Sequence, residues 1–266
     1  MKARALLIGV CLVVLSLLFT SAGGVLASPP GDNPGKNPAS FEKTVFVHYP
    51  KGEPAKGGVP GAPGGGSGID KAPYKYSGIH WADSALPVTY KVNSSVTGSF
   101  LNGLQSAFQT WEDDTASYID FEYDSSAFIG SPSSFIGDGS MNGANEVGWV
   151  SLSASYPNAI AVTAVWRNTF TGLIAEVDMA MNDDLPWSQA ELSAGTDPDA
   201  VTGDPGYYDV QSIATHEVGH WLMLGDLYNK PTASQTMYGY GVRGELKKRS
   251  LESGDLAGLR TIYGIP

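Results

Sequence analysis

The sequence predicts an α+β domain, in which a sheet of about five strands packs on two long helices and a further helix ends the chain. Three observations predict it. Segments with strand composition come first, between residues 86 and 182, one long helical segment interrupts them early, and helical patterns follow from residue 207. Residues 73–266 give this domain roughly 190 residues, a length that is usual for one domain.

The N-terminus has the three-part organisation of a secretory signal peptide, which we expect to span residues 1–27. Lys2 and Arg4 come first, an apolar run extends from Ala5 to Phe19, and small residues lead to Ala27, after which we expect cleavage. The alternative is an uncleaved anchor, because the run is only slightly shorter than the roughly 18 to 20 residues that span a bilayer. Cleavage predicts a secreted, extracellular protein.

The cysteine count and the charge exclude several kinds of protein. Cys11, the one cysteine, lies inside the apolar run, so the mature chain can form no disulfide and cannot use a thiolate to hold a metal site latent. Removal of Lys2 and Arg4 with the signal changes the formal net charge from -11 to -13. This acidity argues against nucleic acid and anionic membranes as partners.

Residues 28–72 are dominated by Gly, Pro, Ser, Asn and Lys. Such a composition buries too little apolar surface to offset the entropy of ordering, so we expect a flexible leader or pro-segment. The more apolar stretch KTVFVHYPKG, residues 43–52, is a candidate strand-like docking segment. We interpret His48 within it as a bystander rather than a ligand.

The domain begins with a strand, a helix and four more strands. LPVTYKV, residues 86–92, alternates apolar and polar side chains as a half-buried strand does. Residues 99–113 then carry one apolar helical face, made of Leu101, Leu104, Phe108 and Trp111. Gly-rich and Asn-rich turns separate the further strand candidates, which are residues 118–123, 145–152, 159–166 and 173–182.

Two helices complete the predicted domain. YYDVQSIATHEVGHWLML, residues 207–224, has the strongest helical pattern. The last helix covers SGDLAGLRTIYG, with Ser253 as the expected N-cap and Gly264 just past its end.

The sequence HEVGHWLMLGD within the first of these helices indicates a metal site. Residues i and i+4 of a helix share a face, so His216 and His220 can present imidazole nitrogens to one ion. Glu217 is rotated by about 100° around the axis and can reach a water bound to that ion without being a ligand. This arrangement is typical of metal-assisted hydrolysis, in which the glutamate accepts the proton of the water and passes it to the leaving amine. The alternative is a buried helix that carries two histidines by coincidence.

A catalytic zinc needs three protein ligands and an open position. Asp226 is the best candidate for the third ligand, because Gly225 tolerates φ > 0 and lets the helix end and the chain fold back beneath the ion. The alternative for Asp226 is a turn residue without a metal. Asp255 fits better as a first-turn acid of the last helix. The remaining candidates are His48, His80, Glu245 and Glu252.

These residues resemble the zinc site of metzincin metallopeptidases, specifically of the matrixin-like family. The motif of that clan is HExxHxxGxxH, with Asp in place of the last His in some members, and residues 216–226 align with the latter form. Eleven residues downstream, SQTMYGYG resembles the Met-turn, with Met237 beneath the zinc ligands. The resemblance covers most of residues 76–266. One departure is Met223, which stands where the family has a glycine, so the chain must turn without it or turn later at Gly225.

The resemblance implies a secreted zinc endopeptidase with a twisted mixed sheet above a horizontal cleft. His216, His220 and Asp226 would bind one catalytic Zn²⁺, and Glu217 would be the general base. An extended substrate would lie along the strand at residues 159–166 and add to the sheet. Residues 238–243 would line the pocket for the residue after the scissile bond, and Tyr238 or Tyr240 would form its wall or stabilise the oxyanion.

The resemblance also raises questions of ions, latency and partners. Structural Ca²⁺ is a family expectation, for which the acid-rich turns NDDLP, TDPDAVTGD and IGDGSMNGAN are candidates, although solvated loops are the commoner explanation. Residues 28–72 could inhibit by occupying the cleft, although nothing in their sequence shows it. We expect a monomer that acts on extracellular protein or peptide, with no nucleic acid and no membrane as partner after signal cleavage. The alternative function is a non-catalytic secreted or cell-surface binding protein that keeps the fold, against which the retention of Glu217 argues.

Overall fold

The structure is a computed structural model, and it describes residues 40–53 and 73–265. All of these belong to one compact unit, Pro38–Pro266. The expected signal peptide, its cleavage site and the rest of the leader lie outside the described residues. Within the described part, none of the helices has the length and apolar character needed to cross a bilayer.

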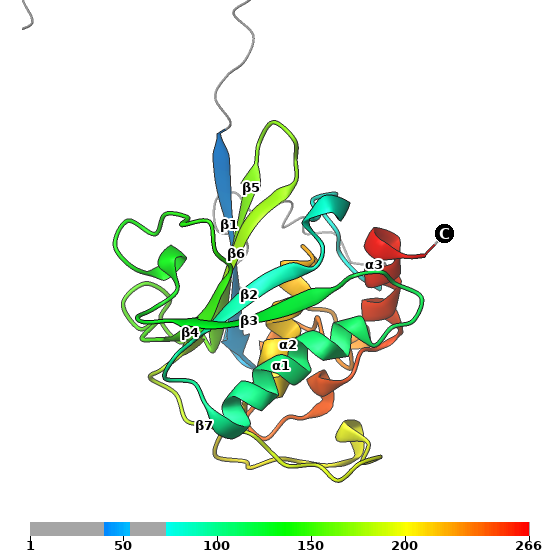
Figure 1. Cartoon of the computed structure of the whole chain (residues 1–266). Coiled ribbons are helices and arrows are strands. Elements are labelled where there is room, and N and C mark those ends of the chain that lie inside the picture. Colours follow the sequence, from blue (N-terminus) through cyan, green and yellow to red (C-terminus); the bar gives the residue numbers. More distant parts are fainter. Residues whose placement is uncertain (1–39, 54–72, 266) are drawn as a thin grey trace, which may run out of the picture. The chain divides into compact units, whose positions relative to one another are not determined.

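A seven-stranded mixed sheet forms the centre of this unit, with the order β3-β2-β4-β6-β5-β1-β9 (Figure 1). The strands from β3 to β6 in this order pair in parallel, β5 is antiparallel to β6, and β1 is antiparallel to β5. The strands are β1 (Phe41–Pro50), β2 (Val88–Asn93), β3 (Phe121–Phe128), β4 (Glu146–Val150), β5 (Ala161–Asn168), β6 (Ile174–Asn182) and β9 (Tyr240–Gly241). A separate pair consists of β7 (Trp187–Ser188) and β8 (Tyr208–Asp209).

Helices α1 and α2 cover one face of the sheet and pack on each other (Figure 1). The α-helices are α1 (Gly98–Glu112), α2 (Val210–Trp221) and α3 (Ser253–Tyr263). Short 3-10 helices lie at Asp83–Ala85, Ser133–Phe135, Pro198–Ala200, Lys230–Thr232 and Lys247–Arg249. The predicted α+β architecture is therefore confirmed, with the predicted five strands and three helices in the predicted order.

The apolar face predicted for α1 is the one that meets α2. Leu104, Phe108 and Trp111 are fully or almost fully buried. Trp111 donates from its indole to the carbonyl of Thr215 at 2.8 Å, and the ring of Phe108 packs edge-on against Trp221. These contacts fix α2, which carries the predicted metal motif, against the rest of the core.

The largest difference from the sequence-based expectation is β1, which lies within the supposed flexible leader. Residues 41–48 pair with β5 in a continuous antiparallel register, from Phe41 opposite Asn168 to His48 opposite Ala161. The alternative of a strand-like docking segment is confirmed here, and a flexible leader is the wrong description for these residues. The average composition of residues 28–72 concealed ten residues whose alternate side chains pack on both faces of the sheet.

Two boundaries also differ. The N-cap of α3 is Glu252 rather than Ser253, because Glu252 forms a reciprocal capping box with Asp255. Helix α2 ends at Trp221, three residues before the end of the predicted helical pattern. This early end brings the chain back toward the metal motif.

Candidate metal centre

Helix α2 presents His216, Glu217 and His220 on one side, and all three side chains are fully buried. The helix is started by Asp209, whose carboxylate accepts the backbone N–H of Ser212 at 2.9 Å. The same carboxylate forms an ion pair with Arg249, which links the first turn of α2 to the 3-10 helix Lys247–Arg249.

Hydrogen bonds to backbone carbonyls orient both imidazoles. The Nδ1 atom of His216 lies 2.7 Å from the carbonyl of Thr236, and the Nδ1 atom of His220 lies 2.7 Å from the carbonyl of Leu224. A carbonyl only accepts, so Nδ1 carries the hydrogen in both rings. The neutral imidazole then leaves Nε2 with a free lone pair, as a metal ligand requires.

Asp226 reaches the same point through a tight turn after α2. Its Oδ1 atom lies 3.1 Å from Nε2 of His216 and 3.6 Å from Nε2 of His220. The turn is made by Met223, whose φ is 58°, whereas Gly225 is not among the residues with positive φ. The expected turn at Gly225 was therefore wrong, and the alternative of a turn without a glycine holds. Met223 stands where the family has a glycine, and it adopts the positive φ itself.

The three donor atoms fit a tetrahedral metal ion. Nε2 of His216, Nε2 of His220 and Oδ1 of Asp226 are buried without a hydrogen-bond partner, and the three residues form a cluster of metal-ligand geometry. Two zinc bonds of about 2.05 Å at the tetrahedral angle place their donor atoms about 3.3 Å apart, close to the two separations found here. The structure thus contains buried groups that could bind a metal ion.

The electrostatics of the cluster also favour a cation. Burial opposes the charge on Asp226, but the two histidines hold the pKa of this carboxyl well below its usual range. Burial likewise lowers the pKa of His220, but Asp226 outweighs it and raises that pKa. Burial lowers the pKa of His216 to about 4. The carboxylate therefore requires a positive charge beside it, which a proton or a metal ion can provide.

Glu217 lies beside this triad. Its Oε2 accepts the hydroxyl of Thr163 on β5 at 2.6 Å, and its Oε1 lies 3.2 Å from Nδ1 of His48. Burial, the strongest influence, raises the pKa of Glu217 to about 7, while the charge of His220 and the hydrogen bond from Thr163 act in the opposite direction. A carboxylate with a raised pKa next to a metal site suits proton transfer near neutral pH.

His48 is part of the centre, so its interpretation as a bystander was wrong. Its ring centroid lies 3.9 Å from that of His216, its side chain is fully buried, and it forms a second cluster of metal-ligand geometry with His216 and Glu217. Burial holds the pKa of His48 well below its usual range, so the neutral ring can donate from Nδ1 to Glu217. The residue was missed because strand pairing across more than a hundred residues leaves no local pattern.

The predicted Met-turn residue packs against α2. Met237 is 1% exposed, and a Cβ atom added to Gly219 would clash with its sulfur. Asp255 accepts the backbone N–H groups of Thr236 and Met237 at 2.8 and 3.1 Å. The carbonyl of Thr236 also accepts the hydrogen bond from Nδ1 of His216, so this turn positions a candidate ligand.

Lys248 is a second residue that sequence reasoning missed. It is fully buried and donates to the carbonyls of Thr236 and Tyr238. Burial lowers its pKa to about 8. The run of basic residues around it gives no sign of a buried amine, because a charge run usually lies in solvent.

The two pocket candidates, Tyr238 and Tyr240, lie near the centre but not on the triad. Both are partly buried, their ring centroids lie 5.7 Å apart, and Tyr240 belongs to β9, which pairs with the end of β1. The tyrosine that contacts a candidate ligand is Tyr228, whose hydroxyl donates to Oδ2 of Asp226 at 3.1 Å. No motif or spacing in the sequence singles out Tyr228.

The other ligand candidates are engaged elsewhere. His80 lies 3.1 Å from the hydroxyl of Tyr76, and Asp255 binds the Met-turn. Among the residues that the structure describes, the clusters with metal-ligand geometry both lie at this centre, and the acid-rich turns proposed for Ca²⁺ form no further one. Glu245 and Glu252 belong to neither cluster.

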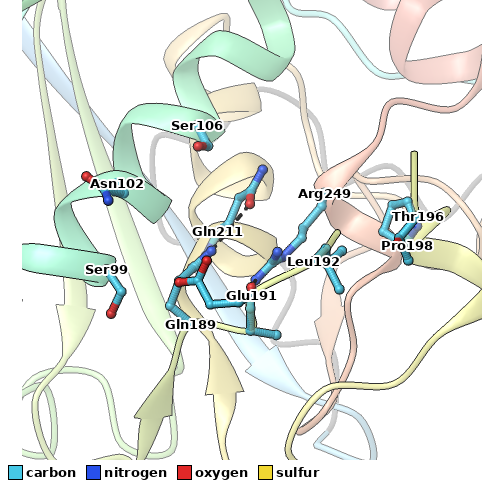
Figure 2. Close-up of a pocket in the computed structure, with 11 residues that line it drawn as sticks. Ser99, Asn102, Ser106, Gln189, Glu191, Leu192, Thr196, Pro198, Gln211 and Arg249 are labelled. Atoms are coloured by element: carbon cyan, nitrogen blue, oxygen red, sulfur yellow. Dashed lines mark hydrogen bonds between the residues drawn. The ribbon is translucent and has the colours of Figure 1, made fainter. Parts of the chain in front are cut away.

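A separate pocket of about 340 Å³ lies beside α1 (Figure 2). Its lining includes Ser99, Asn102 and Ser106 from α1, together with Gln211 and Arg249. The guanidinium of Arg249 is already paired with Asp209, so it is not free for an anionic ligand. This pocket contains none of the triad residues and does not compete with the metal centre as the candidate active site.

No model of a known protein family matches the chain, and no curated protein matches it. The function therefore has to be argued from the geometry of the centre and from its chemistry.

Proposed function

We propose that this protein is a secreted, zinc-dependent endopeptidase of the matrixin-like kind. The observation that carries the proposal is the convergence of three unpartnered, buried donor atoms, from His216, His220 and Asp226, beside the carboxylate of Glu217. Hydrolytic zinc sites combine three protein ligands with a nearby general base. The resemblance of residues 216–237 to the metzincin zinc motif and Met-turn supports the same function.

In this proposal His216, His220 and Asp226 would hold a zinc ion, which would supply Lewis acidity to a water molecule and to the substrate carbonyl. Glu217 accepts a proton from the water and delivers it to the nitrogen of the scissile peptide bond, which leaves as an amine. Thr163 holds one carboxylate oxygen of Glu217, and the other, which lies 3.2 Å from Nδ1 of His48, would exchange that contact for the water. β5 pairs with β6 on one side and with β1 on the other, so it is not the edge strand that was expected, and an extended peptide would have to take the place of β1 beside it.

A non-catalytic binding protein is the alternative. A structural zinc site is closed by four protein ligands and has no use for a carboxylate of raised pKa. Here three residues form the triad, while Glu217 is buried next to it and is held by Thr163. Burying an extra carboxylate has a free-energy cost that a structural role does not explain, and this favours catalysis.

The test compares Glu217→Gln and Asp226→Ala with the parent chain. Glu217→Gln should keep one equivalent of zinc by elemental analysis and lose at least about 100-fold in kcat on casein or a peptide library. Asp226→Ala should lose the zinc as well. Hydrolysis is measured on the intact chain and on the chain cut within residues 54–72, because His48 on β1 contacts Glu217. Glu191→Gln, at an exposed glutamate, is the control and should behave as the parent. Equal hydrolysis by Glu217→Gln and the parent would refute the proposal.

A further inference from the structure

Strand β1 lies directly against the candidate metal centre. It is antiparallel to β5 along residues 41–48 and then parallel to β9, so it lies between the two segments expected to line the substrate cleft. Backbone hydrogen bonds hold it there, from Ile160 N–H to the carbonyl of His48 at 2.7 Å and from Lys51 N–H to the carbonyl of Gly241 at 3.1 Å. An extended peptide substrate would need the same backbone groups.

The side chains of β1 that face α2 cover the metal triad. The ring of Phe46 stacks on His220 with centroids 4.1 Å apart, and the ring of His48 packs on His216. A Cβ atom added to Gly241 would lie 3.2 Å from Nε2 of His48, so this imidazole enters the space that the glycine leaves open. His48 thus fills the space between His216 and Gly241.

His48 also engages the proposed general base. One oxygen of Glu217 is held by Thr163 and the other is 3.2 Å from Nδ1 of His48, so both oxygens have protein partners. A water molecule would therefore have to compete with His48 for Oε1 of Glu217. His216 and His220 are fully buried, so these candidate ligands are also shielded from solvent.

We propose that Phe41–Pro50 is an inhibitory strand, which occupies the peptide-binding cleft in the manner of a substrate and engages Glu217 through His48. This inference rests on the proposed peptidase function. It gives a chain without a cysteine beyond residue 11 a means of latency that needs no thiol. The link from the strand to the domain is the Gly- and Pro-rich segment 54–72, where cleavage would free the strand to dissociate.

The test inserts a recognition sequence for a site-specific protease into residues 54–72 of the full chain. Hydrolysis of a peptide library is measured before cutting and after cutting with dilution. We expect a rise of at least tenfold after cutting. A synthetic peptide of residues 41–50, added to the cut protein, should restore inhibition in a concentration-dependent manner.

A second measurement does not depend on activity. A chelator should remove zinc at least ten times faster from the cut and diluted protein than from the intact chain, because β1 no longer covers the triad. The added peptide should slow this removal again. A peptide with His48→Ala should be at least tenfold weaker in both assays than one with Val47→Ala, since Val47 packs on the opposite face of the sheet.

The outcomes separate the two proposals. Equal hydrolysis and equal zinc release before and after cutting would overturn the inhibitory strand and leave the peptidase function standing. Equal potency of the two variant peptides would overturn the role of His48. Absence of hydrolysis in both forms, with zinc bound, would overturn the peptidase function and the inhibition with it.

Discussion

Glu217 is held between two side chains that come from distant parts of the sequence, Thr163 on β5 and His48 on β1. Only the contact with Thr163 persists once β1 leaves. The hydroxyl of Thr163 is then the group that fixes the orientation of the base. In the proposed mechanism it would position Glu217 rather than touch the substrate.

We predict that Thr163→Val lowers kcat of the cut protein about tenfold with little change in KM. Valine keeps the shape but removes the hydroxyl, and a hydrogen bond to a charged group is worth about 1.5 kcal/mol, or about tenfold in rate. Thr163→Ser should restore most of kcat. Steady-state kinetics and elemental analysis for zinc check this, and an unchanged kcat in the valine variant would contradict it.

The site residues that the sequence predicted are those placed by local backbone geometry. His216, Glu217 and His220 follow from helical spacing, and Asp226 follows from a short turn, so all four lie where the motif predicts. Thr163, Lys248 and His48 contact the centre through strand and loop packing, which has no local periodicity. His48 in particular was misjudged because its strand partner lies more than a hundred residues away.

The turn between α2 and Asp226 is the element on which the geometry of the triad depends. Met223 is 2% exposed and adopts a φ of 58°. This conformation costs a residue other than glycine about 1–2 kcal/mol. The burial of its side chain offsets that cost.

We predict an unusual stability order at this position. Met223→Ala and Met223→Gly both delete a buried side chain and should be destabilised by about 2–5 kcal/mol. The glycine variant should nevertheless be about 1 kcal/mol more stable than the alanine variant, because glycine adopts positive φ without strain. Leu222, whose φ is -93°, is the control, where alanine should be the better substitute. Denaturant unfolding gives these values, and the same order at both positions would exclude strain at Met223.

The turn after α1 is linked to helix α3 by an ion pair between Asp114 and Arg260, with oxygen–nitrogen distances of 2.6 and 2.9 Å. The hydrogen bond from Arg260 lowers the pKa of Asp114 below its ordinary value of 3.8. A lowered pKa in the folded state means that the pair stabilises the fold above about pH 4 and stops doing so as the pH falls through the folded-state pKa.

Asp114→Asn should therefore lower the melting temperature at pH 7 by at most about 3 °C, as is usual for a pair with one exposed partner. The difference from the parent should disappear in strong acid. Asp113→Asn is the matched control, since that carboxylate bonds Gln109 instead. Thermal unfolding between pH 3 and 7 tests this, and a difference that grows toward acid pH would contradict it.

The elements that the sequence predicted well are those with a strong internal pattern. The strands β2, β4, β5 and β6 and the helices lie within about three residues of their expected bounds. β1 was obscured by the Gly- and Pro-rich residues around it, and β9 is two residues long, too short for any alternation to show. Both form through pairing with partners that are distant in the sequence.

For the whole molecule, metal binding should contribute to stability as well as to chemistry. The triad joins α2 to the turn that carries Asp226, and His216 is bonded in addition to the Met-turn. An ion that binds only the folded chain stabilises it by about 4 kcal/mol at 1,000 times its dissociation constant.

We predict that chelation of the zinc lowers the melting temperature by on the order of 10 °C. Readdition of zinc should reverse the change. Asp226→Ala should show no dependence on zinc, which makes it the control. Calorimetric scans at fixed protein concentration check the effect, and a melting temperature independent of zinc in the parent would show that the triad does not bind it.

Dissociation of β1 would also expose apolar side chains and backbone groups of the sheet. Val45, Val47 and Tyr49 complete a small apolar cluster with Val162 and Ala180 on the face of the sheet away from α2. Their departure would uncover this cluster together with the unpaired backbone of β5, and such bare sheet edges pair with other chains and aggregate. The protein without β1 should therefore aggregate readily and lose its activity with time. Another extended polypeptide that pairs with the free edge of β5 would prevent this loss.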